Sequence, residues 1–111
     1  MSDLNDIFNR EISLEELEEV NGGTAGEWHV LDVVFNGADM WDAPDLNARG
    51  RSQLDQKIKQ LTGFKIHYGF YDLKADIVIK APDGTLMDLY EFLDYIKANY
   101  TMDEILSWQK L

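Results

Sequence analysis

The chain contains no cysteine among its 111 residues. This absence excludes disulfides, cysteine nucleophiles, thiolate metal sites and lanthionine rings. No run of 18 or more apolar residues occurs, so no segment is predicted to span a membrane. The N-terminus also lacks the basic region and the apolar region of a general secretory signal, because Asp3, Asp6 and Glu11 make it acidic. Export by the general route is therefore not expected.

Basic residues are few, with 10 Lys and Arg against 21 Asp and Glu and a net charge of −11. A protein that follows a phosphate backbone needs a basic patch, and none is present. The same acidity argues against attraction to anionic lipid. We therefore expect no nucleic-acid partner and no insertion into a membrane.

Catalytic and cofactor motifs are absent as well. The sequence has no Walker loop, no GxGxxG and no zinc signature. His29 and His67 are far apart and have no Ser or Cys partner pattern, which favours structural or surface roles. Asp39, Asp42 and Asp45 lack the alternating spacing of an EF-hand loop and are interpreted as a solvated acidic loop. We predict that the chain is not an enzyme and uses no cofactor and no metal.

The most informative segment is residues 12–23, with the sequence ISLEELEEVNGG. Ser13 and Glu16 have the S-x-x-E spacing of a capping box, in which each side chain accepts a hydrogen bond from the other residue's backbone. Ile12 and Leu17 stand at the two positions of a hydrophobic staple. The segment therefore predicts a short helix with a defined start.

One face of this predicted helix is apolar, and its end is abrupt. Leu14, Leu17 and Val20 recur every three residues, which keeps them on one side of a helix. Gly22 and Gly23 disfavour a helix interior and tolerate positive φ. An amphipathic helix that stops at a glycine pair is the expected structure.

This segment resembles the double-glycine leader, or bacteriocin-type signal, of peptides exported by peptidase-containing ABC transporters. In that family an apolar residue, often followed by Ser, begins the motif. Glu-Leu follows, then an apolar residue four positions before the cut, and Gly-Gly or Gly-Ala at the cut. The matching positions in this chain are Ile12-Ser13, Glu16-Leu17, Val20 and Gly22-Gly23. The resemblance covers residues 1–23 only.

The resemblance implies that the chain is a substrate and that its partner is the peptidase domain of the transporter, which supplies the nucleophile. The apolar helix face would fill a groove of that domain, and the two glycines would lie extended in a channel too narrow for side chains. The residues implied in leader recognition are Ile12, Leu14, Glu16, Leu17 and Val20, and those at the cleavage site are Gly22, Gly23 and Thr24.

The resemblance divides the chain into a leader, residues 1–23, and a mature cargo domain, residues 24–111. It implies synthesis in the cytoplasm and secretion after leader removal, as a bacteriocin-like or signalling protein. The cargo departs from the family norm because it is acidic and patterned like a globular domain, which puts pore formation in doubt. Because a transporter passes an unfolded chain more easily, we expect the cargo to have low stability within the precursor. The alternative is an intracellular α+β binding or interaction domain whose N-terminal helix merely ends in Asn-Gly-Gly.

The predicted fold class is α+β, with the leader helix followed by about three strands and two to three helices. The periodicities predict strands at 27–36, 64–71 and 75–81 and helices at 46–62 and 101–108. Residues 85–100 are predicted as a helix, or as a strand through Leu89 followed by a helix from Tyr90. Residues 3–10 are predicted either as a short helix with Leu4, Ile7 and Phe8 on one side or as a frayed terminus.

Residues 27–36 are predicted as a central strand because they are rich in β-branched and aromatic side chains and apolar on both faces. Asp32 is then expected near a sheet end or a helix N-terminus, with a structural role. Residues 24–26 are expected to form a flexible junction between leader and cargo. A crossover through the helix at 46–62 should place the next strand parallel to the first and right-handed, if the two are neighbours.

Overall fold

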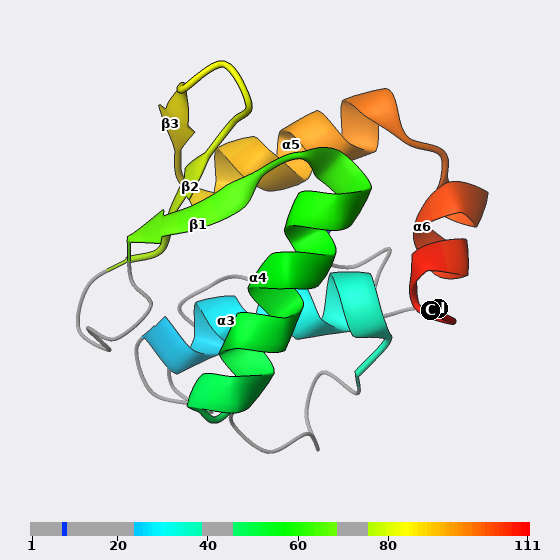
Figure 1. The fold of residues 1–111 in the computed structure, drawn as a ribbon. Helices are drawn as coiled ribbons and strands as arrows, with labels where there is room; N and C mark the ends of the chain where they lie inside the picture. Colours follow the sequence, from blue (N-terminus) through cyan, green and yellow to red (C-terminus); the bar gives the residue numbers. More distant parts are fainter. Residues whose placement is uncertain (1–7, 9–23, 39–45, 69–75) are drawn as a thin grey trace.

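The computed structural model describes residues 8, 24–38, 46–68 and 76–111. These residues form helices and strands in the order α3 (Thr24–Asn36), α4 (Ala48–Thr62), β1 (Lys65–Tyr68), β2 (Val78–Lys80), β3 (Leu86–Met87), α5 (Leu89–Asn99) and α6 (Met102–Trp108), shown in Figure 1. The three strands make one sheet of order β1-β2-β3 in which both pairs are antiparallel. The predicted α+β fold class is confirmed.

The prediction of a strand at 27–36 is wrong, since these residues belong to helix α3. The predicted flexible junction at 24–26 is wrong for the same reason, because the helix begins at Thr24. The parallel crossover expected from that strand is also wrong, because the described sheet is wholly antiparallel. The described residues after position 23 therefore contain three strands and four helices.

Helix α3 is buried on nearly every side from residue 27 to residue 35, which explains why its sequence favours a central strand. All but one of the residues from 27 to 35 are less than a tenth exposed, the exception being Asp32. A helix that is covered all round needs no polar face, so its apolar residues show no helical period. Periodicity alone cannot separate such a helix from a buried strand.

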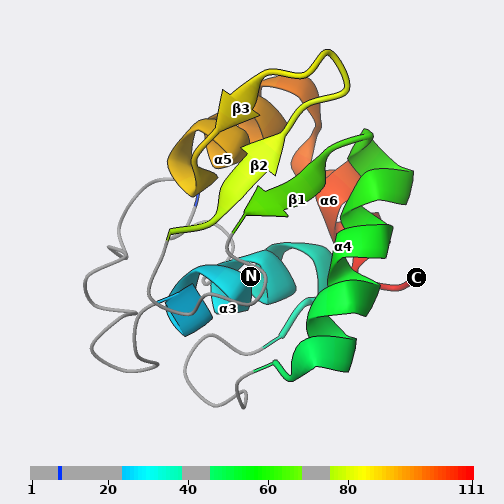
Figure 2. The same ribbon diagram turned by 60° about the vertical axis from the view of Figure 1, so that its left-hand side comes forward.

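Helix α4 passes in front of α3 in Figure 1, stands beside the end of α3 in Figure 2, and leads into β1. Asn47 caps its start by accepting a hydrogen bond from the Gly50 N–H at 2.8 Å. The helix ends at Gly63, which has the left-handed conformation at φ 80°. A Cβ at this position would also lie 2.9 Å from the Pro82 ring, so glycine is required by both conformation and space.

Two successive hairpins build the sheet. Strands β1 and β2, which lie within the segments predicted as strands at 64–71 and 75–81, pair antiparallel with Ile66 opposite Ile79. The Pro-Asp-Gly turn then returns the chain into β3, where Ile79 stands opposite Met87. In this turn the Thr85 N–H donates to Asp83 Oδ1 at 2.9 Å. Burial is confined to one face of β1 and β2, since Ile66 and Ile79 are buried and their neighbours along the strands are not.

Helices α5 and α6 begin at capping boxes. Asp88 with Glu91 forms the capping box of α5, and Thr101 with Glu104 forms that of α6. Because α5 begins at Leu89 after the short strand β3, the strand-then-helix alternative for residues 85–100 is the correct one. Figure 2 shows α5 behind the sheet, which it covers on one face.

An aromatic cluster joins three of the helices. The Phe35 ring of α3 stacks on the Trp108 ring of α6, with centroids 5.4 Å apart and planes at 5°. It also stacks on Phe92 of α5 at 6.1 Å, and Phe92 contacts Phe64 at 5.1 Å. Burial of these rings gives the domain a large part of its apolar core.

Candidate functional site

The predicted leader motif lies outside the described residues. This holds for the recognition residues Ile12, Leu14, Glu16, Leu17 and Val20, and for the glycines Gly22 and Gly23. The roles assigned to them therefore stay predictions from the sequence.

Thr24, the remaining residue of the predicted cleavage site, is the first residue of α3. The residue after the predicted cut therefore belongs to helix α3 itself, and no flexible segment separates the cut from this helix. The start of this helix was not predicted, because a glycine such as Gly26 favours a linker over a helix interior.

The first turn of α3 is tied to the sheet by a buried carboxylate. Glu27 is 3% exposed, and its Oε2 accepts a hydrogen bond from the Ile77 N–H, just before β2, at 3.1 Å. A negative charge in the first turn of a helix is also favoured by the helix dipole. The chain just after the predicted cut is therefore anchored in the domain.

The predicted leader also touches the domain through residue 8. Phe8 is helical and 6% exposed, and its side chain belongs to the same apolar core as α3, α4 and α5. The Lys97 Nζ of α5 donates a hydrogen bond to the Phe8 carbonyl oxygen at 3.4 Å. The sequence predicts Phe8 on the apolar side of a short helix, but it does not indicate which residues pack against that side.

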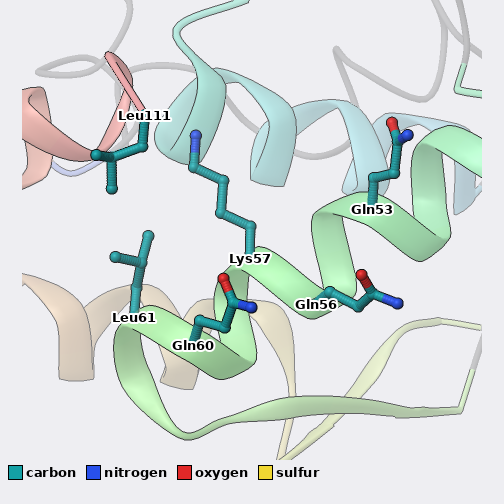
Figure 3. A pocket seen from close by; sticks show the side chains of 6 residues that line it. All are labelled: Gln53, Gln56, Lys57, Gln60, Leu61 and Leu111. Atoms are coloured by element: carbon teal, nitrogen blue, oxygen red, sulfur yellow. The ribbon is translucent and has the colours of Figure 1, made fainter.

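A hollow of about 250 Å³ lies where α4 faces the end of the chain (Figure 3). In the figure the Lys57 side chain extends from α4 toward α3, and Leu61 faces Leu111. The α4 hollow is lined by Gln53, Gln56, Lys57, Gln60, Leu61 and Leu111. The lining side chains are three amides, one amine and two leucines, which can bind both polar and apolar atoms.

A hydrogen-bonded chain links this hollow to the end of α3. Lys57 Nζ donates to Asn36 Oδ1 at 2.8 Å, and Asn36 Nδ2 donates to Asp32 Oδ1 at 2.7 Å. Burial lowers the pKa of Lys57, and the negative charge of Asp32 partly offsets this effect. The expectation that Asp32 lies near a sheet end or a helix N-terminus is wrong, because it sits late in α3 and orients Asn36. Its expected structural role fits this position.

The remaining candidates are dispersed. His29 is buried in α3 at 2% exposure, whereas His67 is exposed on β1. Asp39, Asp42 and Asp45 lie outside the described residues. Within the part of the chain that the structure describes, no three His, Asp or Glu side chains are grouped so that they could hold a metal ion.

Comparison with known proteins gives no relative to guide the assignment. No protein-family model, no curated protein and no solved structure matches this chain. In the described ranges, no helix is both long and apolar enough to cross a membrane.

Proposed function

We propose that this protein is the precursor of a secreted small protein, exported by a peptidase-containing ABC transporter after cleavage between Gly23 and Thr24. The observation that carries the proposal is the agreement of residues 12–23 with every position of the double-glycine motif, in register. The chain is then a substrate, and the transporter's peptidase domain is its partner.

The residue types of the motif fit this partner. Ile12, Leu17 and Val20 offer an apolar helix face to a groove, with Leu14 beside them and Glu16 in the capping box. Gly23 lets the backbone approach a narrow catalytic channel closely because it has no Cβ.

The compact cargo imposes a further requirement on export. Helix α3 starts at Thr24 and is buried in the core from Glu27 to Phe35 apart from Asp32, so residues 24–111 must unfold before they can pass as an extended chain. The Glu27 hydrogen bond to the Ile77 N–H is among the first contacts that unfolding from the new N-terminus would break. We therefore expect unfolding of α3 to accompany export.

A second candidate function follows from the burial of Phe8. Phe8 lies in the predicted leader but is only 6% exposed in the core of the domain. The same burial is expected of an intracellular α+β binding domain whose N-terminal helix merely ends in Asn-Gly-Gly. In that case residues 1–23 would be a permanent part of the domain.

The two candidates differ in their response to a double-glycine peptidase domain. We expect incubation with such a domain from the same genome to remove residues 1–23, as measured by intact mass. Leu17→Ala and Gly23→Val should abolish the cut, because one removes an anchor from the groove and the other adds branched bulk at the scissile bond. Glu18→Gln is the matched control outside the motif and should be cut like the parent. If the parent stays whole under conditions that process a known leader, the second candidate is favoured.

A further inference from the structure

Phe8 stands on the leader side of the predicted cut, yet it packs into the core of the cargo. Its side chain is 6% exposed, and the rest of the buried apolar cluster comes from residues after position 27. Its carbonyl oxygen accepts a hydrogen bond from Lys97 Nζ, 89 positions away in the sequence. Phe8 of the leader therefore contacts the cargo in two ways: its side chain is buried in the core, and its carbonyl oxygen accepts a hydrogen bond from a charged side chain.

We propose that residues 24–111 carry a binding site for their own leader, filled by the Phe8 side chain and closed by Lys97. The cleavage step of this inference rests on the function proposed above. Before the cut, the covalent chain and these contacts together hold Phe8 in the core. After the cut, only the contacts of the leader with the domain hold it, so leader and cargo become two partners.

The consequence is a domain that loses part of its core when the leader departs. Truncation of a buried Phe leaves a cavity that the surrounding side chains fill only in part, and departure of Phe8 does the same. Cleavage followed by leader release therefore makes the cargo easier to unfold, at the stage when an unfolded chain is needed. The leader stabilises the precursor and, once cut and released, withdraws that stabilisation.

The test uses the full chain with a recognition sequence for an unrelated site-specific protease inserted between residues 23 and 24. The purified protein is cut, and size-exclusion chromatography with intact mass of each peak shows whether fragment 1–23 stays with the cargo. Thermal unfolding is recorded before and after the cut over a range of protein concentrations. We expect the fragments to co-elute at high concentration, and the cut protein to melt at lower temperature as it is diluted.

Variants assign the effect to the two contacts. We expect Phe8→Ala to weaken retention of the leader by about a hundredfold or more, the usual effect of truncating a buried Phe. Lys97→Met keeps an apolar stem, removes the donor to the Phe8 carbonyl, and should weaken retention by about tenfold. Phe8→Leu keeps most of the apolar volume and stays testable if Phe8→Ala does not fold. Leu111→Ala truncates an apolar side chain that is 80% exposed and should leave retention unchanged.

The proposal is overturned if the leader separates from the parent as readily as from Lys97→Met and from Phe8→Ala, with Phe8→Leu taking the place of Phe8→Ala only if that variant does not fold. It is also overturned if the cut and uncut parent melt at one temperature at every concentration. Because an unrelated protease makes the cut, neither result depends on recognition by the transporter. Failure of the transporter peptidase to cut would contradict the proposed function and leave this binding site standing.

Discussion

Phe35→Ala is the substitution that most directly tests the placement of α3 at the centre of the domain. The Phe35 side chain is fully buried, and its ring stacks on Trp108 at 5.4 Å and on Phe92 at 6.1 Å. It therefore joins α3 to α5 and α6. Removal of the ring exposes parts of two further aromatic side chains to a cavity.

The expected loss is large compared with the stability of a small domain. Phe→Ala at a buried site costs about 3–5 kcal/mol of unfolding free energy, against about 5–15 kcal/mol for a whole domain. At about 4–8 °C per kcal/mol, the melting temperature should fall by about 12 °C or more. Phe35→Leu keeps most of the apolar volume and should lose much less.

The measurement is urea unfolding followed by far-ultraviolet circular dichroism for the parent, Phe35→Ala, Phe35→Leu and Leu86→Ala. Leu86 is 52% exposed, so its truncation should change the unfolding free energy by less than about 0.5 kcal/mol. A loss for Phe35→Ala no larger than that for Leu86→Ala would refute the central position of α3.

Three further predictions concern polar groups. Glu27→Ala leaves the Ile77 N–H without its acceptor in a buried site and should cost about 1–3 kcal/mol in urea unfolding, whereas Glu27→Gln retains an acceptor and should lose less. Asp88→Ala removes the capping box with Glu91 and should cost about 1 kcal/mol in the same assay. Burial raises the pKa of Tyr100 above its ordinary value of 10.0, so the folded chain keeps the phenolic proton to higher pH than the unfolded chain, and stability should fall as the pH rises above 10.0. Tyr100→Phe should show a smaller fall between about pH 9 and pH 11, and an equal fall in both proteins would contradict the assignment.

The elements that form one apolar face were predictable from the sequence. Helix α4 was predicted because Leu54 and Ile58 recur at helical spacing before Gly63, and both are buried. The hairpin of β1 and β2 was predicted because polar and apolar residues alternate on a sheet with one wet face. In both α4 and the hairpin, the apolar residues recur along the sequence with the same period as the buried positions of the helix or strand.

Helix α3 was not predictable in this way, because tertiary burial overrides local propensity. Val30, Val33 and Val34 favour strands, and only packing of other elements around the helix, α4 and α6 among them, allows all three to be buried. The predicted segment at 27–36 is longer than most strands, and this length was a signal that favoured a helix.

The contacts at the candidate sites depend on pairs far apart in the sequence. Phe8 and Lys97 are separated by 89 positions, and Asn36 and Lys57 by 21. No local pattern indicates such pairings. The leader motif differs from these contacts because it is defined by residue types at short spacings along the sequence. It can therefore be recognised without knowledge of the fold.

The most direct test of the proposed export is the N-terminus of the protein recovered from the culture medium of cells that carry a matching transporter. We expect intact mass and N-terminal sequencing to give a chain that begins at Thr24, and no such product when the transporter peptidase is inactivated. Recovery of the protein only inside the cells, with residues 1–23 attached and the transporter active on a known leader, would contradict the proposal.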